Sequence, residues 1–535
     1  MADTLARPEQ PTDPSLAALS KGRRVWLLVV ACMGVSLVIS SMIGLNTALS
    51  DIAIATSATQ TQLTWVVDGY TLVLACLLLP AGAVGDRYGR RGALLIGLAI
   101  FSVASVAPLM FDSPTQIILA RAVAGAGAAF VMPATLSLLT AAYPKSERNK
   151  AVGIWAAVAG SATVIGFLGS GLLLNFWSWQ SIFWAFAIAG AAMIVLTCTV
   201  PSSRETDAAP LDWWGAGLIG AAVAVFVFGV IEAPARGWTD PGVLICIAVG
   251  VVLAVVFGFV ELRRRFPLLD VRLFGRPDFA TGAVGVTLLF FANFGFFFVV
   301  IQYIQLVMGY TPLRTAVAIA PLAAPLLVFG VLTPWYLPRM GLRLTVFSGL
   351  LILSAGLLFM QLLENGSSFW DLTWPMLVMS TGIGLCTAPT TSAIMGAVPD
   401  DKQGVASAVN DATREIGAAL GIAVAGSIFA AQYADALSPG LSAFPPEIRG
   451  PATDSPAEAL EISEKMGPQG AQLADLAESA FLQAMDSSLF AIAAVVAVAA
   501  VFVAIWAPGR DGQQLRIVRR LSGRARARNV ARHRS

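Results

Sequence analysis

The stretch Gly82-Ala-Val-Gly-Asp-Arg-Tyr-Gly-Arg-Arg91 places a charged turn between two apolar runs, at residues 63–84 and 92–111. Each run has about the 20 residues that an α-helix needs to cross the hydrocarbon core of a bilayer. The glycines allow a tight turn, and an aspartate among arginines can make charge-assisted hydrogen bonds between helix ends. This stretch therefore predicts two transmembrane helices joined by a short, structured turn.

The whole chain has the composition of a membrane protein. Of its 535 residues, 57% are hydrophobic and only 12% are charged, and the mean hydropathy is +0.76. Soluble domains are about 25% charged, so a water-soluble fold is excluded. The sequence contains no nucleophile–base pair, metal-ligand cluster or phosphate-binding loop. We therefore expect no enzyme, no cofactor, no metal and no nucleic-acid partner.

Apolar runs of this kind recur along the chain. Fourteen of them lie at residues 26–48, 63–84, 92–111, 115–142, 151–174, 182–200, 213–232, 241–261, 279–306, 314–336, 344–363, 373–395, 404–430 and 485–507. An even number places both termini on one side. With the termini in the cytoplasm, most of the 34 basic residues fall in cytoplasmic segments, as the positive-inside rule requires. The sequence predicts an all-α integral membrane protein with fourteen transmembrane helices and cytoplasmic termini.

A weak internal repeat suggests how these helices are grouped. The turn at 86–91 is echoed by Pro338-Arg-Met-Gly-Leu-Arg343, and each stretch follows the second helix of a set of six. We expect two six-helix bundles at 26–200 and 279–508, with an inserted two-helix hairpin at 201–278. The second bundle includes an outer loop at 431–484, with a short amphipathic helix near 457–465. Tails at 1–25 and 509–535 complete the chain.

The turn at 82–91 resembles the signature loop of the major facilitator superfamily, G-x-L-x-D-R-x-G-R-R, with Val84 in the leucine position. The resemblance implies a conformational gate that does not touch substrate. Its residues would be Gly82, Asp86, Arg87, Gly89, Arg90 and Arg91. The alternative, a basic loop that only fixes topology, explains neither the acid nor the glycines.

A second resemblance concerns the fourth apolar run, where Arg121-Ala-Val-Ala-Gly-Ala-Gly-Ala-Ala129 is similar to the family motif R-x-x-x-G-x-G-A-A. Small residues let helix backbones approach closely, and a charged residue inside a membrane needs a partner. Asp68 lies at a matching depth in the second run, so we expect Asp68 and Arg121 to pair. They could serve proton coupling or form a purely structural ion pair.

The thirteenth apolar run carries Asp411, Arg414 and Glu415, three and four residues apart and so on one helix face. This run resembles the corresponding helix of the fourteen-helix drug:proton antiporters. Two carboxylates that share one arginine favour a state in which one of them is protonated, as a proton carrier would be. The alternative is a structural triad whose charges are all satisfied.

The chain departs from the family pattern at two places. In the first helix Ser41 stands where the family usually has an acid, while Asn46 is kept. In the fifth helix the antiporter signature G-P-x-x-G-G appears as Gly166-Phe-Leu-Gly-Ser-Gly171. Both departures make antiport less certain than transport itself.

These observations favour a secondary transporter in a bacterial cytoplasmic membrane, which exports lipophilic or cationic drugs in exchange for protons. Its partners would be a small-molecule substrate, protons and the lipid bilayer. Polar or aromatic residues within apolar helices are candidates for the substrate cavity, namely Asn46, Trp155, Asn293, Gln302 and Asn410. Two alternatives stay open: export of an endogenous lipid or metabolite, and a non-transporting membrane receptor.

Overall fold

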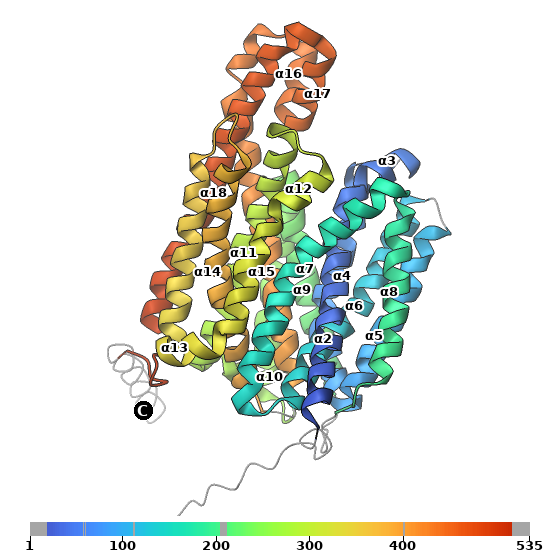
Figure 1. Cartoon of the computed structure of the whole chain (residues 1–535), viewed down its shortest axis with the longest axis vertical. Helices are drawn as coiled ribbons and strands as arrows, with labels where there is room; N and C mark the ends of the chain where they lie inside the picture. The colour runs from blue at the N-terminus through green and yellow to red at the C-terminus, as the bar shows by residue number, and fades with distance from the viewer. Residues whose placement is uncertain are drawn as a thin grey trace, which may run out of the picture.

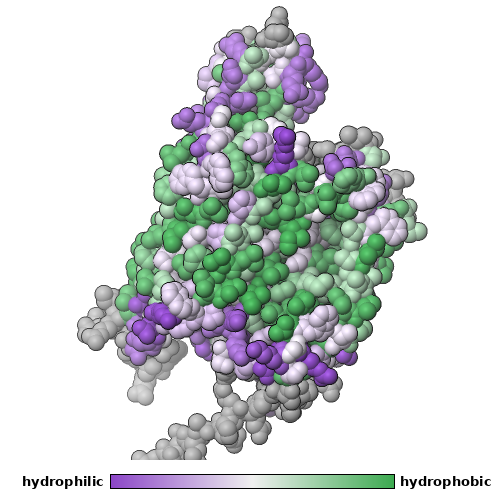
Figure 2. Space-filling view, in the orientation of Figure 1, coloured by the Kyte–Doolittle hydropathy of each residue, from purple (hydrophilic) through white to green (hydrophobic). Residues whose placement is uncertain are grey.

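The computed structural model describes residues 19–56, 58, 60–110, 113–203, 211–399 and 402–515. Most of the predicted N-terminal tail and the basic tail from residue 516 lie outside these ranges. Helices make up the described chain, and an apolar band covers the middle of the molecule, with polar residues gathered at both ends (Figures 1 and 2). This distribution is what a bilayer requires of a protein that spans it.

The described residues contain fourteen membrane-spanning segments. Thirteen helices are long and apolar enough to cross a membrane, and the longest of them, Leu313–Leu362 with 50 residues, is two segments. Gly341 breaks it with a φ of 73°, a left-handed conformation that costs glycine little. The predicted fold class is therefore confirmed.

The first half of the chain forms one helical bundle. Its membrane helices are α2 (Lys21–Gly44), α4 (Gln60–Tyr88), α5 (Arg90–Val106), α6 (Pro114–Ala142), α7 (Lys145–Phe176) and α8 (Gln180–Cys198), with the short α3 (Leu49–Thr56) between α2 and α4. Helix α7 begins at Lys145 because Pro144 precedes it in an extended conformation. The basic stretch 145–150, which lies between the predicted apolar runs 115–142 and 151–174, therefore forms the first turns of α7.

The second half forms the other bundle. It contains α11 (Pro277–Gln302), the short α12 (Pro312–Ile319), α13 (Ala323–Phe359), α14 (Phe369–Gly396), α15 (Gln403–Leu437) and α18 (Ala471–Trp506). Between the halves, α9 (Trp213–Arg236) and α10 (Pro241–Arg263) form the inserted hairpin. Aspartates cap both hairpin helices: Asp212 accepts from Gly215 N at 2.9 Å, and Asp240 from Gly242 N at 2.9 Å.

The stretch 431–484 differs from the predicted loop. Helix α15 continues to Leu437, α18 already begins at Ala471, and α16 (Pro446–Asp454) and α17 (Pro456–Met466) fold between them. A helix of 35 residues is about 52 Å long, beyond the roughly 30 Å of a bilayer core. The four segments build a polar projection, here called the turret, at one end of the molecule (Figure 1). The short helix predicted near 457–465 is present as α17.

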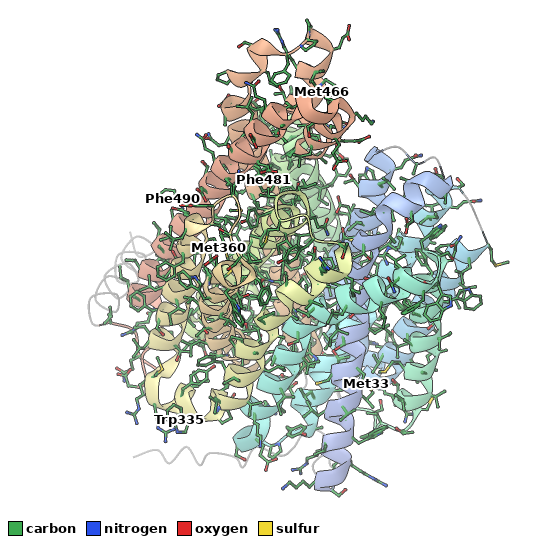
Figure 3. The ribbon with its side chains drawn as sticks, turned by 45° about the horizontal axis from the view of Figure 1, so that its top comes forward. Met33, Trp335, Met360, Met466, Phe481 and Phe490 are labelled. Atoms are coloured by element: carbon green, nitrogen blue, oxygen red, sulfur yellow. The ribbon has the colours of Figure 1, made fainter. Side chains whose placement is uncertain are left out.

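The turret stands on an aromatic core between α15 and α18. Phe481 of α18 is buried and packs edge-on against Phe429 of α15, with ring centroids 4.8 Å apart. Phe490, further along α18, is exposed on the outer face of the bundle (Figure 3). This contrast matches a helix with one face on its bundle and the other toward lipid.

Candidate functional site: an inter-bundle cavity and its latch

Asp86 joins the two bundles at the end of the molecule opposite the turret, here called the latch end. From the C-terminal end of α4, its carboxylate accepts hydrogen bonds from the backbone N–H groups of Gly404 (2.8 Å) and Val405 (3.1 Å). These groups open α15, so an acid of one bundle caps a helix of the other, where the helix dipole favours negative charge. Arg90 holds the same carboxylate through Nη2, 2.8 Å from Oδ1. Asp86 and Arg90 are both buried.

Two glycines let α4 and α15 approach at this point. A Cβ atom added to Gly82 would lie 2.5 Å from the carbonyl oxygen of Gly404, and one added to Gly404 would lie 2.5 Å from that of Gly82. Real side chains do not tolerate such contacts, so both positions need glycine as long as this crossing is closed. The close approach brings Asp86 within reach of the α15 backbone.

The other residues of the predicted gate fix the turn itself. Gly89 has a φ of 113°, a backbone region that side chains rarely adopt. Arg91 donates from Nη1 to the carbonyl oxygen of Val200 at 3.0 Å, and Arg90 N donates to that of Ser203 at 2.9 Å. Arg87 lies over the ring of Tyr88, with its guanidinium carbon 5.5 Å from the centroid. Arg90 and Arg91 thus tie the turn to the end of α8.

A second glycine crossing closes the opposite side of the latch end. Helices α7 and α13, one from each bundle, meet at Gly153 and Gly330. A Cβ atom on Gly330 would lie 2.6 Å from the Gly153 carbonyl oxygen and 2.6 Å from Ala157 Cβ. The two bundles are therefore in backbone contact on both sides of the latch end.

A large cavity lies between the bundles on the turret side of these crossings. Its volume is about 490 Å³, and residues of α2, α4, α7, α9, α11 and α15 line it. Asp68 is the one charged residue among the described residues of the lining. Four phenylalanines, at positions 167, 294, 297 and 298, supply aromatic surface, and Asn46 lies at its rim beside Thr47. This composition suits an apolar ligand that carries a positive charge.

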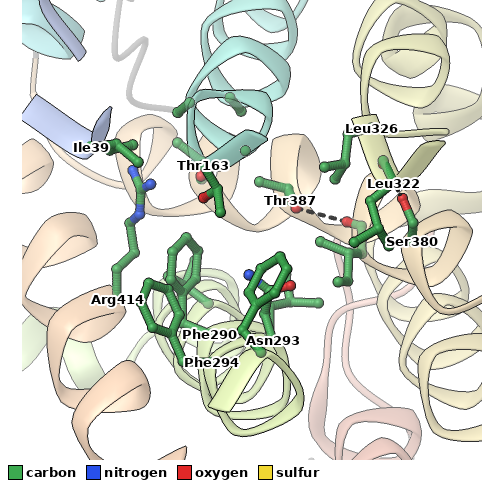
Figure 4. A pocket seen from close by; sticks show the side chains of 18 of the residues that line it. Ile39, Thr163, Phe290, Asn293, Phe294, Leu322, Leu326, Ser380, Thr387 and Arg414 are labelled. Carbon is green, nitrogen blue, oxygen red and sulfur yellow. Dashed lines mark hydrogen bonds between the residues drawn. The ribbon is translucent and has the colours of Figure 1, made fainter. Parts of the chain in front are cut away.

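A smaller cavity of about 50 Å³ adjoins the large one. Met42, Thr163, Phe294 and Phe297 line both, so they separate the two compartments. In the small cavity Arg414 lies on one side, and Leu326 and Ser380 on the other (Figure 4). Trp155, Asn293 and Glu415 also line it.

The three charged residues of α15 are not equivalent. Arg414 Nη1 lies 3.6 Å from Asp411 Oδ1, which also accepts from Asn410 Nδ2 at 3.2 Å. Glu415 makes no ion pair with Arg414 within 4 Å among the described residues. One oxygen of each acid, Asp411 Oδ2 and Glu415 Oε2, is buried without a hydrogen-bond partner there, so the ion pair alone distinguishes the two acids. The Arg414 guanidinium instead stacks over Phe290, 4.5 Å from the ring centroid. A buried carboxylate without a partner is more stable when it is protonated.

The expected pair of Asp68 and Arg121 is not formed. Arg121 is buried, and it donates to Ser41 Oγ at 3.0 Å, to the Ser41 carbonyl at 3.1 Å and to the Val66 carbonyl at 3.2 Å. Its guanidinium also lies 4.2 Å from the centroid of the Tyr70 ring. Asp68 faces the large cavity instead. Equal depth in the membrane was a poor guide, because the rotation of each helix decides which way a side chain points.

The predicted cavity residues divide between the two compartments. Asn46 lines the large cavity, and Trp155 and Asn293 line the small one. Gln302 and Asn410 line neither: Gln302 donates to the Phe298 carbonyl at 2.7 Å, and Asn410 is buried against Asp411. The phenylalanines of α11 were missed because in an apolar helix they do not stand out as candidate ligands. The role of Ser41 as a partner of Arg121 could have been suspected from the sequence, because Ser41 stands where the family usually has an acid.

The comparisons with known proteins agree with this architecture. The sequence model of the Major Facilitator Superfamily matches residues 28–422, well over half of the chain. The chain belongs to the major facilitator superfamily. Among its major facilitator relatives, the multidrug resistance protein Stp of Mycobacterium tuberculosis is 34% identical over 422 residues, 78% of each chain. The multidrug efflux pump LfrA of Mycolicibacterium smegmatis is 30% identical over 87% of this chain and 90% of its own.

A third major facilitator relative and a solved structure complete the comparison. The methylenomycin A resistance protein of Streptomyces coelicolor is 33% identical over 79% of this chain and 86% of its own. A bacterial homolog of the human lysosomal transporter Spinster, solved in an inward-facing state, aligns with a TM-score of 0.57 at 18% identity. That alignment covers 91% of this chain and 98% of the other, and at this identity it supports the fold alone.

Proposed function

We propose that this major facilitator protein exports lipophilic organic cations across the bacterial cytoplasmic membrane in exchange for protons. One observation carries the proposal: among its described lining residues, the cavity between the bundles combines a single acid, Asp68, with four phenylalanines. Aromatic faces attract cations, and a carboxylate in surroundings of low dielectric attracts them further. A neutral or anionic substrate would gain nothing from Asp68.

The proton site of this exchange is Glu415. Its carboxylate lies at the small cavity, next to the substrate compartment, and it lacks the ion pair that occupies Asp411. Protonation removes a buried charge without breaking a bond to Arg414. Arrival of a proton and departure of a cation then leave the charge of the cavity region unchanged, so one can replace the other.

The latch end faces the cytoplasm in this proposal. The segments at that end carry most of the basic residues of the chain, which is the pattern of cytoplasmic loops. With the crossings at Gly82 and Gly330 closed, the large cavity lies toward the outer side, where an exporter releases its substrate. Rocking of the bundles would break the Asp86 cap and expose the cavity to the cytoplasm.

The names of the relatives support the drug-like class of substrate. Stp and LfrA are described by multidrug resistance and efflux, and a relative from Salmonella typhimurium, 28% identical, by resistance to methyl viologen, an organic dication. Asp68 gives this chain the acid that such a substrate needs.

The test is transport in inverted membrane vesicles with an imposed pH gradient. Fluorescent lipophilic cations such as ethidium should accumulate when the vesicle interior is acidic, and the accumulation should collapse when an ionophore removes the gradient. A neutral dye of similar size should not accumulate. Accumulation of the neutral dye alone, or accumulation that does not depend on the pH gradient, would refute the proposal.

A further inference from the structure

Helix α9 of the inserted hairpin is attached to both bundles, although it belongs to neither six-helix set. On the side of α4, the rings of Trp65 and Phe228 stack with centroids 5.7 Å apart and planes 30° apart. A Cβ atom on Gly220 would lie 3.0 Å from the Cys76 carbonyl oxygen, so the two helix backbones approach closely. On the side of α15, Trp238 Nε1, just beyond the end of α9, donates to Ser427 Oγ at 2.7 Å.

This helix occupies the space that opens between α4 and α15. The two helices meet directly at Gly82 and Gly404 near the latch end. Toward the turret end the large cavity lies between them, and Val227, Ile231, Pro234 and Ala235 of α9 form part of its lining. Helix α9 is thus a side wall of the substrate compartment.

The two attachments differ in kind. The contact with α4 runs along much of α9 and includes a buried apolar cluster of Ala75, Val223 and Val227, against which Leu72 and Ile231 pack. The contact with α15 is smaller and includes Ala419, which packs on the same cluster, the Trp238–Ser427 hydrogen bond and an approach of Gly426 to Pro234. A long apolar contact resists separation, whereas a single neutral hydrogen bond can be exchanged at little cost.

We propose that α9 is a moving side wall of the substrate cavity, which travels with the N-terminal bundle and releases the C-terminal bundle when the cavity closes at the turret end. The inference rests on the proposed function, because alternating access requires the outer parts of α4 and α15 to approach each other. Helix α9 lies between them, so it must lose its contact with one of the two helices. The structure indicates that the Trp238–Ser427 contact with α15 is the one that breaks.

Reversible cross-linking compares the two attachments directly. All five native cysteines are first replaced, and cysteine pairs are then placed at Trp65 and Phe228 (α4 to α9) or at Trp238 and Ser427 (α9 to α15). A short, reducible bifunctional thiol reagent joins each pair, and single-cysteine variants treated with the same reagent are the controls. We expect the 65–228 link to leave cation transport largely intact. The 238–427 link should abolish transport, and reduction should restore it.

Three results would overturn the moving wall: transport that survives the 238–427 link, transport blocked by both links, or a block by the 65–228 link alone. A second measurement does not depend on transport. Spin labels at Arg236→Cys and Ala431→Cys report on α9 and α15, and labels at Arg236→Cys and Gln62→Cys report on α9 and α4. Distances are compared at acidic and mildly alkaline pH in lipid nanodiscs.

The 236–431 distance should change with pH, and the 62–236 distance should stay constant. If these distances behave as expected but the unlinked protein moves no cation, the moving wall is upheld and the proposed function fails. If cations are transported while 62–236 changes and 236–431 stays fixed, the wall travels with the other bundle and the inference is wrong.

Discussion

Three acids lie deep in the membrane region, and their surroundings separate them. Asp411 is paired with Arg414, Asp68 faces the large cavity, and Glu415 lies at the small cavity with an unpartnered oxygen. The sequence placed Asp411 and Glu415 near one arginine, but it did not show which of the two acids would lack an ion pair with that arginine. The ion-pair geometry identifies Glu415 as the acid without an ion pair to Arg414. Substitution of each acid is therefore expected to have a different effect.

Glu415→Gln should abolish uphill, pH-driven efflux but leave downhill exchange of a labelled cation intact. Glutamine keeps the size of the protonated acid but cannot release a proton, so substrate can still cross while the coupling is lost. The measurement compares both modes in proteoliposomes, with Glu447→Gln, an exposed turret residue, as the matched control. Uphill efflux at the wild-type rate in Glu415→Gln would rule out Glu415 as the proton carrier.

Asp411→Asn should instead act on stability. It leaves Arg414 buried without its ionic partner, and breaking one side of a buried ion pair typically costs about 3–5 kcal/mol. We expect a clear drop in the melting temperature of the detergent-solubilised protein. Size-exclusion chromatography of heated samples measures this temperature. Asp454→Asn on the turret is the control, since its side chain is exposed. A melting temperature equal to that of the wild type would show that the pair is not needed.

Asp68→Asn should weaken the binding of cations and spare that of neutral compounds. Loss of one charge-assisted contact is worth about 1.5–3 kcal/mol, roughly 10- to 100-fold in Kd. Fluorescence titration with ethidium and with a neutral dye measures both. Equal losses of affinity for the two ligands would mean that Asp68 affects the shape of the cavity and does not recognise the charge of the substrate.

Among the elements, the contact of α4 with α15 decides which end of the molecule is closed. A carboxylate of one bundle caps a helix of the other, and two facing glycines make the approach possible. In the proposed transport cycle this contact forms only in the state that is closed at the latch end, and it would bias the equilibrium toward that state. It does not touch the cavity lining.

Asp86→Asn should therefore cripple transport while equilibrium substrate binding stays within a few fold of the wild type. The amide keeps the shape of the side chain but loses the charge that holds the α15 backbone and Arg90. Turnover and Kd are measured on the same preparation. Asp278→Asn, a half-buried acid at the first turn of α11 that pairs with Arg276 and lies outside the latch, serves as the control. A large loss of affinity with normal turnover of the bound fraction would contradict the latch.

At the scale of the whole molecule, the turret and the latch mark opposite ends, and the distribution of basic residues predicts that the latch end faces the cytoplasm. In a protein whose native cysteines are replaced, Ser455→Cys in the turret region should react with a membrane-impermeant thiol reagent from outside intact cells. Ser146→Cys in the first turn of α7 should react only after the cells are opened. Labelling of position 146 from outside would reverse the proposed orientation, and with it the direction of export.

The sequence by itself determined the fold class, and its motif at 82–91 predicted the gate residues around Asp86, whose role stays a prediction. Hydrophobic run length and charged turns are local properties, and a bilayer leaves few ways to satisfy the backbone of fourteen apolar runs. Of the five residues predicted for the substrate cavity, Asn46, Trp155 and Asn293 line one of the two cavities, and Gln302 and Asn410 line neither.

Only the tertiary structure decided the partners. Arg121 binds Ser41, 80 residues away, and not Asp68, while Asp86 caps a helix 318 residues further along the chain. Such pairings depend on the rotation and tilt of each helix within its bundle, and small errors in either turn a side chain toward a different neighbour. Apart from α17, the helical structure of the turret was missed, because helices outside the membrane lack the long apolar run that indicates a membrane span. The sequence predicted a two-helix hairpin at 201–278, but it could not predict that α9 packs against both α4 and α15, because those contacts join segments far apart in the chain.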